Sequence, residues 1–505
     1  MTASTISAID VLLADHTPDA AWRRILLTHA TLAHPARAAG VVSAPEFEGV
    51  ELLDVDVLAG YELGVISTFY EYTLAVSSPD SRKSAGQYFT PDDVSRFMVS
   101  RAAGFGDGVW LDPASGVGNL SSMLASVQPD PERFVERSLL LVDRDPTALL
   151  IARTLLHLRF SVTNPHLFTD LAARCLLRDF LGDEPLPDFD FAILNPPYAA
   201  APADLRFETF ESRDWYVYFL ERVMSKARGF VSVTPQNFTN GAKYSVLRRL
   251  LLDYDQLDVF SFDNMPDTLF RGVKYGSTNT NLHNSSRASV TVAVNNGGPR
   301  VHRITPLLRW AAAERGELFA RAPHMLSAQR MTVDKFPKNY AALSDLYAAA
   351  REWRPLAELV SPKRTAYRLV MPSTPRYYIS ATKRALTRSS YREVFFRSQG
   401  DLDLCYPLLN SSYMYWWWHV NGDGMMLTKG LTESLPVPPT LCLQLELVAA
   451  LEASELVNLT VKMNAGKPNE NVKHPLDLVE RVTATLFDAE LAAALRATHR
   501  SNNTA

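Results

Sequence analysis

The chain has 505 residues, of which 47% are hydrophobic and 21% are charged, and its formal net charge is −4. This length exceeds that of an ordinary single domain, so two or three domains are expected, and the composition excludes a disordered or fibrous chain. No apolar run reaches the roughly 20 residues that span a bilayer, and the N-terminal stretch lacks a basic start. We therefore expect a soluble, cytoplasmic protein without a signal peptide and with no membrane contact.

Residues 1–80 are predicted to form a helical region. Apolar residues recur at three- and four-residue spacing in VLAGYELGVISTFYEYTLA (57–75), which is the period of an amphipathic helix. The polar stretch SSPDSRKSAGQ (77–87) follows and is predicted to be a loop.

Residues 81–300 alternate short apolar runs with helical segments. The runs predicted as strands are 108–113, 138–145, 189–197, 229–235, 257–263 and 288–294. Strands that alternate with helices predict an α/β fold, in which helices cover both faces of a mainly parallel sheet. Ligands bind such a sheet beyond the carboxyl ends of its strands, so the residues at those ends form the candidate site.

The first two strands end in motifs that suit a nucleoside. LDPASGVGNL (111–120) has Gly116 and Gly118, a turn that lets the backbone approach a ligand, although a plain strand-to-helix turn has the same pattern. The next strand ends in VDRD, where we expect Asp143 to bind ribose hydroxyls. Asp145 precedes a proline, so we expect it to cap the following helix.

Further along, RDFLG (178–182) places Asp179 beside Phe180. An acid next to an aromatic ring suits the amino group and the ring face of adenine. A core phenylalanine beside a surface aspartate is the alternative, and the pair taken by itself favours that alternative.

NPPY ends a later strand. Pro196 and Pro197 fix φ and lack an N–H, so neither a strand nor a helix continues through them. An exocyclic amine on an aromatic base is a poor nucleophile because its lone pair is delocalised into the ring. The side-chain oxygen of Asn195 and the carbonyl of Pro196 can accept the hydrogens of such an amine, and Tyr198 offers a face for the base. The motif predicts a site that methylates an amine, with a rigid proline turn as the alternative.

Together these motifs resemble those of the gamma-class DNA adenine-N6 methyltransferases, the group that includes the TaqI methyltransferase and many type I and type IIG modification subunits. GQYFTP (86–91), DPASGVGNL, VDRD, RDF and NPPY occur in the order found in that family. LFRGVKYG (269–276) resembles its second base-contacting motif. Ser115 stands where the family usually has cysteine, but methylation of an amine needs no thiol.

The resemblance implies a Rossmann-like methyltransferase domain with a mainly parallel, seven-stranded sheet. It implies a helical N-terminal region (1–80), a catalytic domain (81–300) and a C-terminal α+β domain for target recognition and DNA binding (301–505). The implied cofactor is S-adenosyl-L-methionine (AdoMet), and no metal is expected. The implied cofactor contacts are Thr90, Pro91, Asp112, Ala114, Gly116, Asp143, Asp179 and Phe180. The implied catalytic residues are Asn195, Pro196, Pro197, Tyr198 and Phe270, the last as a second clamp on the base, with Phe238 as the alternative clamp.

The C-terminal part contains a basic region. Residues 321–400 hold 15 Lys+Arg against 5 Asp+Glu, whereas residues 1–80 hold 3 against 11. A basic region in an acidic chain is typical of a surface that binds nucleic acid, and a solvated basic face is the alternative. The candidate DNA-binding residues are Lys363, Arg364, Arg368, Lys383, Arg384, Arg388 and Arg392. The run Trp416–Trp418 is predicted to be core.

By this resemblance the chain transfers a methyl group from AdoMet to N6 of an adenine flipped out of double-stranded DNA. Its expected setting is a restriction-modification or phage-defence system, with a separate restriction or defence subunit as a possible partner. Two alternatives stay open. One is a methyltransferase with the same motif that acts on RNA or a protein glutamine, and the other is a DNA-binding defence component that only senses AdoMet.

Overall fold

The computed structural model describes residues 2–77, 90–271, 274–275, 278–279, 287–464 and 466–501. The predicted loop beyond Ser77, the first four residues of GQYFTP and part of LFRGVKYG lie outside these residues. The chain forms two compact units. The first comprises Met1–Phe238, Lys243–Val259 and Thr268–His302, and the second comprises Thr239–Ala242, Phe260–Asp267 and Arg303–Ala505. The assignment of a function to each part of the chain stays a prediction.

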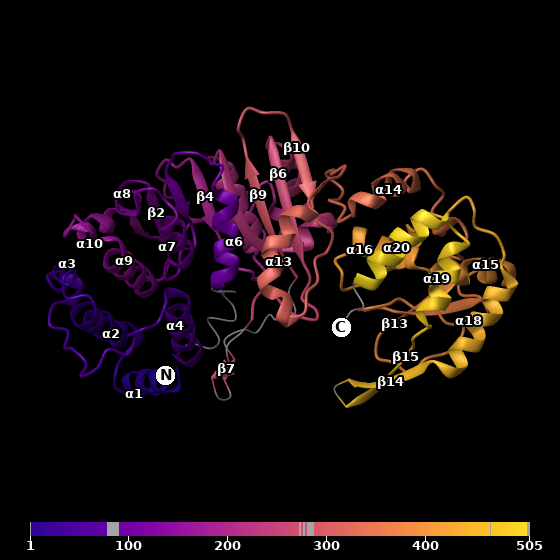
Figure 1. Cartoon of the computed structure of the whole chain (residues 1–505), viewed down its shortest axis with the longest axis horizontal. Coiled ribbons are helices and arrows are strands. Elements are labelled where there is room, and N and C mark those ends of the chain that lie inside the picture. Colours follow the sequence, from indigo (N-terminus) through magenta and orange to yellow (C-terminus); the bar gives the residue numbers. More distant parts are fainter. Residues whose placement is uncertain are drawn as a thin grey trace. The chain divides into compact units, whose positions relative to one another are not determined.

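A nine-stranded sheet with order β11-β10-β6-β9-β5-β4-β1-β2-β3 forms the centre of the fold (Figure 1). Its strands are β1 (Trp110–Asp112), β2 (Leu139–Asp143), β3 (Cys175–Leu177), β4 (Phe191–Leu194), β5 (Gly229–Pro235), β6 (Gln256–Phe262), β9 (Ala288–Val294), β10 (Val301–Ile304) and β11 (Ser327–Ala328). β1 pairs in parallel with β2 and β4, β2 with β3, and β4 with β5. β5 pairs antiparallel with β9. A separate two-stranded pair consists of β7 (Lys274–Tyr275) and β8 (Thr278–Asn279).

The predicted α/β class with a mainly parallel sheet is confirmed, and all six predicted strands are present. The resemblance implied seven strands, whereas the sheet has nine. Of these, β3, β10 and β11 were not among the six predicted runs. These strands have two to four residues, and β3 is partly exposed, so none of them has the continuous apolar run of a buried strand.

The first unit also contains helices. They are α1 (Thr2–Asp15), α2 (Pro18–Ala33), α3 (Ala39–Val42), α4 (Leu63–Ser77), α6 (Asp92–Ala102), α7 (Asn119–Ser126), α8 (Pro131–Arg137), α9 (Pro146–Phe160), α10 (Leu167–Asp170), α11 (Trp215–Met224) and α12 (Ser245–Leu252). The N-terminal region is helical, as predicted. Its helices share a core with α9, in which Trp22 and Phe69 are fully buried together with Ile151.

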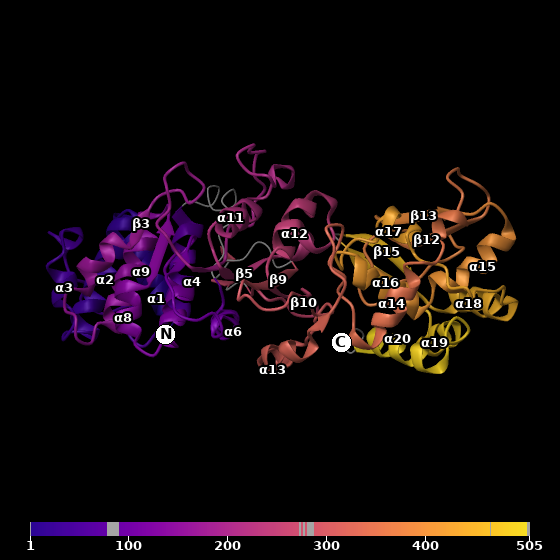
Figure 2. The same ribbon diagram turned by 90° about the horizontal axis from the view of Figure 1, so that it is seen from above.

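The second unit combines helices with two hairpins (Figure 2). Its helices are α13 (Arg315–Arg321), α14 (Ser344–Ala350), α15 (Gln399–Leu409), α16 (Ser412–Asn421), α17 (Lys429–Glu433), α18 (Leu445–Val457), α19 (Leu476–Ala484) and α20 (Ala489–Ser501). The hairpins are β12 (Arg368–Pro372) with β13 (Tyr391–Phe395), and β14 (Leu459–Asn464) with β15 (Lys467–Val472).

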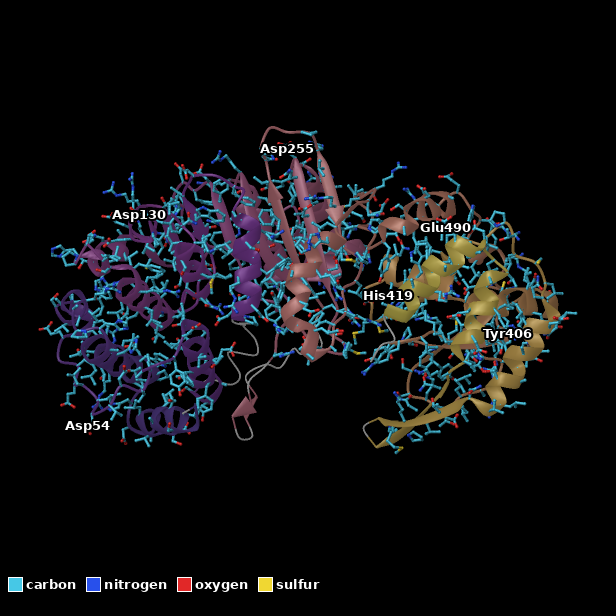
Figure 3. The ribbon with its side chains drawn as sticks, viewed as in Figure 1. Asp54, Asp130, Asp255, Tyr406, His419 and Glu490 are labelled. Atoms are coloured by element: carbon cyan, nitrogen blue, oxygen red, sulfur yellow. The ribbon has the colours of Figure 1, made fainter. Side chains whose placement is uncertain are left out.

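Large aromatic side chains fill the core of the second unit. Trp416, Trp417 and Trp418 on α16 are at most 4% exposed, so the prediction that this run is core is confirmed. Tyr406 and His419 lie in the same interior (Figure 3), and the Tyr406 hydroxyl donates to a carboxylate oxygen of Glu455. Within the described ranges, no helix is both long and apolar enough to cross a bilayer.

Candidate active site

A cavity of about 280 Å³ lies at the carboxyl ends of β1, β2, β3 and β4. The turns that follow these strands line it at 112–116, 143–145, 178–181, 195 and 197, and Thr90, Asn119, Leu120 and Ala148 complete this side. Helices α4 and α11 contribute Tyr70, Leu74, Trp215 and Phe219. The cavity therefore lies where a parallel sheet binds its ligand.

The turn after β1 is held against Asp143. Gly116 has φ 50° and Gly118 has φ 81°, a left-handed conformation that favours glycine. The N–H of Gly116 donates to Asp143 Oδ2 over 2.8 Å, and the N–H of Asp145 donates to Asp143 Oδ1 over 3.0 Å. Asp145 itself accepts from the first turn of α9, so its predicted role as a helix cap is confirmed. The carboxylate of Asp143 is thus fixed in direction at the cavity.

Two acids of the cavity have raised pKa values. Burial raises the pKa of Asp112 to about 7, and the nearby charge of Asp143 acts in the same direction. The hydroxyl of Ser121 donates to Asp112 Oδ2 over 2.8 Å. Burial also raises the pKa of Asp143. Such acids favour a ligand that is cationic or donates hydrogen bonds.

Asp179 and Phe180 directly follow β3. Phe180 is 2% exposed, and its ring lies 5.0 Å from that of Phe219 on α11. Asp179 Oδ1 accepts from the N–H of Leu181 over 2.9 Å. The pair therefore stands near a strand end and lines the cavity, and its role in binding adenine stays a prediction.

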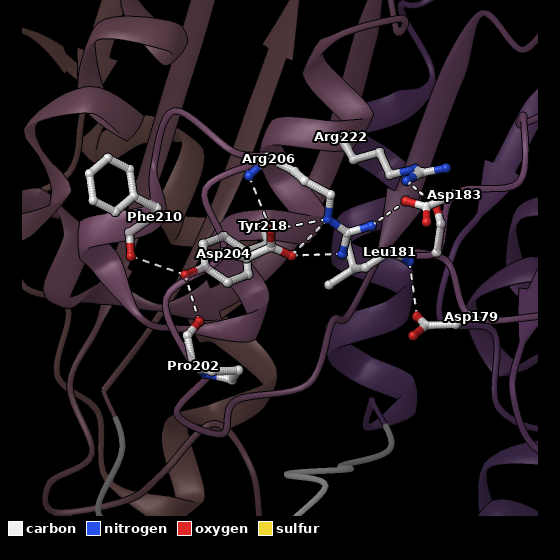
Figure 4. A network of polar contacts seen from close by, with 10 residues as sticks. Asp179, Leu181, Asp183, Pro202, Asp204, Arg206, Phe210, Tyr218 and Arg222 are labelled. Atoms are coloured by element: carbon white, nitrogen blue, oxygen red, sulfur yellow. Dashed lines mark hydrogen bonds and ion pairs between the residues drawn. The ribbon is translucent and has the colours of Figure 1, made fainter.

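Arg222 of α11 forms hydrogen bonds to the backbone of the turn that follows Phe180 (Figure 4). Its guanidinium donates to the carbonyl of Gly182 over 2.6 Å and to the carbonyl of Glu184 over 2.9 Å. It also lies 5.6 Å from the ring centroid of Phe180. On the solvent side, Arg206 pairs with Asp183 over 2.5 Å.

NPPY begins where β4 ends, and its asparagine is bonded to the FTP segment. Asn195 is 9% exposed, and its Nδ2 donates to Thr90 Oγ1 over 3.1 Å. Asn119 Nδ2 in turn donates to the carbonyl of Thr90 over 2.7 Å. Since Nδ2 faces the threonine hydroxyl, the acceptor oxygen Oδ1 lies on the side of the amide away from Thr90.

Two aromatic rings meet beside this motif. The ring centroids of Tyr198 and Phe270 are 5.8 Å apart at 73°, and the Tyr198 hydroxyl donates to the carbonyl of Val233 over 2.9 Å. Phe238, the alternative clamp, has a fully buried side chain. The structure thus places Phe270 edge-on against Tyr198, and the role of the two rings as clamps on a base stays a prediction.

Most of the predicted site residues come together. The cavity lining includes Thr90, Asp112, Ala114, Gly116, Asp143, Asp179, Phe180, Asn195 and Pro197. Pro91, Pro196, Tyr198 and Phe270 are not part of that lining. The sequence interpretation missed Tyr70, Arg178, Trp215 and Phe219. The four-residue spacing of Trp215 and Phe219 on one helix face was a usable signal.

The proposed DNA-binding residues lie on β12, β13 and the neighbouring loops of the second unit. Lys363 and Arg364 are exposed. Lys383 is held by two carboxylates, Asp403 over 2.6 Å and Glu452 over 2.5 Å.

The other four proposed residues also have protein partners. Arg368 pairs with Glu393, and Arg384, Arg388 and Arg392 donate to the oxygens Glu455 O, Asn471 Oδ1 and Leu427 O. Contact of these seven residues with DNA stays a prediction.

The open α/β fold and the cavity at the carboxyl ends of its strands are compatible with an AdoMet-dependent methyltransferase. Residues 62–282 match the model of the family described as N-6 DNA Methylase. The match confirms the resemblance seen in the motifs, and AdoMet is the cofactor that it implies.

Several solved structures are similar at low identity. The DrdV–DNA complex is 14% identical over 63% of this chain and 39% of that chain, with a TM-score of 0.39. The modification subunit of a putative type I restriction enzyme from Vibrio vulnificus is 14% identical over 60% of this chain and 68% of that chain, with a TM-score of 0.38. The ATP-dependent type ISP enzyme LlaBIII bound to DNA is 12% identical over 93% of this chain and 38% of that chain, with a TM-score of 0.41. This chain therefore spans less than half the length of DrdV and LlaBIII.

The cavity lining fits AdoMet. The acids Asp112 and Asp143 suit its hydroxyls and its positive charge, and Phe180 suits its adenine ring. The Oγ of Ser115 is buried and has no hydrogen-bond partner in the part of the chain that the structure describes, so the lining retains a polar group for a ligand.

Proposed function

We propose that the chain is a site-specific DNA methyltransferase that modifies N6 of adenine within a restriction-modification or defence system. The hydrogen bond between Asn195 and Thr90 carries this proposal, because it directs the amide of NPPY at the edge of the cofactor cavity.

The residues divide the chemistry between them. Asn195 Oδ1 and the carbonyl of Pro196 accept the hydrogens of the target amine, which frees its lone pair from conjugation with the ring. Tyr198 stacks on the flipped adenine, and Phe270 packs against that assembly. The prolines keep these groups in fixed directions. When bound, AdoMet supplies an electrophilic methyl group.

The seven basic residues of the second unit are proposed to contact duplex DNA. The exposed Lys363 and Arg364 are the first candidates for phosphate contacts, since their side chains reach solvent. A separate restriction or defence subunit is the proposed partner.

A transfer assay with several acceptors tests the proposal. The purified chain is incubated with radiolabelled AdoMet and duplex DNA, total RNA or a release-factor protein, and the modified product is identified after digestion. We expect label only in N6-methyladenine from DNA. Label in RNA or glutamine would overturn the choice of substrate. AdoMet binding without transfer to any acceptor would favour a sensor.

A further inference from the structure

The β14–β15 hairpin forms an arm at the edge of the second unit (Figure 1). It follows α18 directly, and its strands pair antiparallel from Leu459 with Val472 to Asn464 with Lys467. A two-stranded ribbon has no hydrophobic core of its own, so packing against another surface is needed to stabilise its exposed part.

Both faces of the arm are exposed toward its turn. Side chains alternate between faces along a strand, so Val461 and Met463 share one face while Thr460 and Lys462 share the other. Val461 is 58% exposed and Met463 is 68% exposed. Thr460 and Lys462 are exposed as well. Neither face is therefore covered by the body of the second unit.

The other end of the arm is anchored to the basic segment. Thr387 N–H donates to Glu470 Oε2 over 2.6 Å, and Glu470 N–H donates to the carbonyl of Thr387 over 2.8 Å. Arg388, one of the residues proposed to bind DNA, donates to Asn471 Oδ1 over 2.7 Å. The arm thus extends from the part of the chain that carries the basic candidates.

The two faces of the arm have different chemistry. The register pairs Lys462 with Asn469 and Met463 with Pro468, so Lys462 and Lys467 lie on one face. Val461, Met463, Pro468 and Glu470 lie on the other, and the carboxylate of Glu470 accepts from the N–H of Thr387. Neither lysine has an ion pair or side-chain hydrogen bond to a residue that the structure describes.

This pattern matches a groove of duplex DNA. Rows of phosphates border the groove, while its floor and walls present base edges and apolar sugar surfaces. The major groove is about 12 Å wide and admits a two-stranded β-ribbon. Two cations next to a basic segment favour a polyanion over a neutral protein surface.

We propose that the β14–β15 arm enters a groove of the substrate DNA. Lys462 and Lys467 contact phosphates there, and Val461 and Met463 contact sugars and base edges. This inference rests on the proposed function, and it adds an element and four side chains to the basic candidates predicted from the sequence.

Salt dependence tests the lysines. Binding of the full chain to a fluorescently labelled duplex is measured by anisotropy over a series of salt concentrations. A plot of the logarithm of the association constant against the logarithm of the salt concentration has a negative slope, and each lost phosphate contact makes it shallower by about 0.9. The double variant K462A/K467A should therefore make the slope shallower by about 1.8. Lys429→Ala is the matched control, since Lys429 is an exposed lysine of the same unit that pairs with Glu433 over 3.5 Å. It should keep the wild-type slope.

A second variant tests the apolar face. Met463→Gln should weaken DNA binding by on the order of tenfold without changing the slope, because it removes apolar contact and no charge. Circular dichroism and thermal unfolding, which report on both units, should match the wild type in all variants and show that they fold.

The outcomes separate the two proposals. A wild-type slope for K462A/K467A overturns the proposal that the arm contacts DNA, while the proposed function stands. The same result is expected if the arm binds a protein subunit. A wild-type chain that does not bind duplex DNA overturns both.

Discussion

Asn195 and Thr90, separated by 105 positions in the chain, are joined by a 3.1 Å hydrogen bond from Nδ2 to Oγ1. Thr90 lies just before α6, and Asn195 lies just after β4. The contact brings the FTP segment and NPPY together at one cavity.

Thr90→Val should therefore lower kcat for DNA methylation. The change keeps the shape of the side chain and removes one neutral hydrogen bond, which contributes about 1 kcal/mol, or a factor of about five. Steady-state assays at saturating AdoMet measure the effect. Thr440→Val is the control, because the Thr440 hydroxyl donates to the carbonyl of Leu486 in the second unit. Equal kcat for the Thr90 and Thr440 variants would show that the contact does not orient Asn195.

The variants Tyr198→Ala and Tyr198→Phe should differ in how well they capture the flipped base. The phenylalanine variant loses only the bond from the hydroxyl to Val233, whereas the alanine variant loses the face on which the base stacks. Stacking of a base on an aromatic ring is worth about 1–3 kcal/mol. With a fluorescent base analogue at the target position, the alanine variant should show weak capture of the flipped base and the phenylalanine variant should remain close to wild type. Equal capture by both would contradict the stacking role.

Arg222→Met should weaken AdoMet binding by about tenfold while leaving kcat at saturating AdoMet near the wild-type value. Arg222 braces the turn that carries Phe180 but is not part of the cavity lining, so its loss loosens the adenine end. Calorimetry with AdoMet and the split between KM and kcat measure this. Arg206→Met removes the 52% exposed cation that pairs with Asp183 of the same turn, and it should have little effect. A loss of kcat without a change in affinity would contradict the role of Arg222.

Asp112→Asn should change how stability depends on pH. The folded-state pKa of Asp112 is raised to about 7 by burial, so its effect on stability is absent below the unfolded pKa near 4. As pH rises from about 4 to 7, the buried carboxyl resists ionisation and the wild type loses stability, by up to about 1.4 kcal/mol per pH unit. The Tm of the Asp112→Asn variant relative to wild type should therefore increase between about pH 4 and pH 7 and level off above that. A difference in Tm that is constant over this range would show that Asp112 does not titrate there.

Long apolar runs made the sheet predictable, and short strands did not. β5 and β9 are each seven residues long and almost entirely buried, so the sequence predicts them at their observed bounds. β3 has three residues between polar neighbours, and its place in the sheet depends on pairing with β2, which a local pattern does not contain.

The site was predictable where chemistry and backbone constraint occur in one short motif. NPPY and the glycine turn each place special residues at a strand end, and most of the residues inferred from them line one cavity. Arg222 was missed because its partners are the carbonyls of Gly182 and Glu184, and backbone acceptors leave no trace in the sequence. Lys383 shows that a charge in the sequence does not reveal its partner. Its charge suggested contact with DNA, whereas in the structure it forms ion pairs with Asp403 and Glu452.

The most direct test of the central claim is long-read sequencing of genomic DNA from cells that express this chain, compared with cells that express Asn195→Ala. The account predicts N6-methyladenine at one short sequence motif with the wild type and none with the variant, in which AdoMet binding persists. Equal N6-methyladenine with both chains, or none with either, would contradict it.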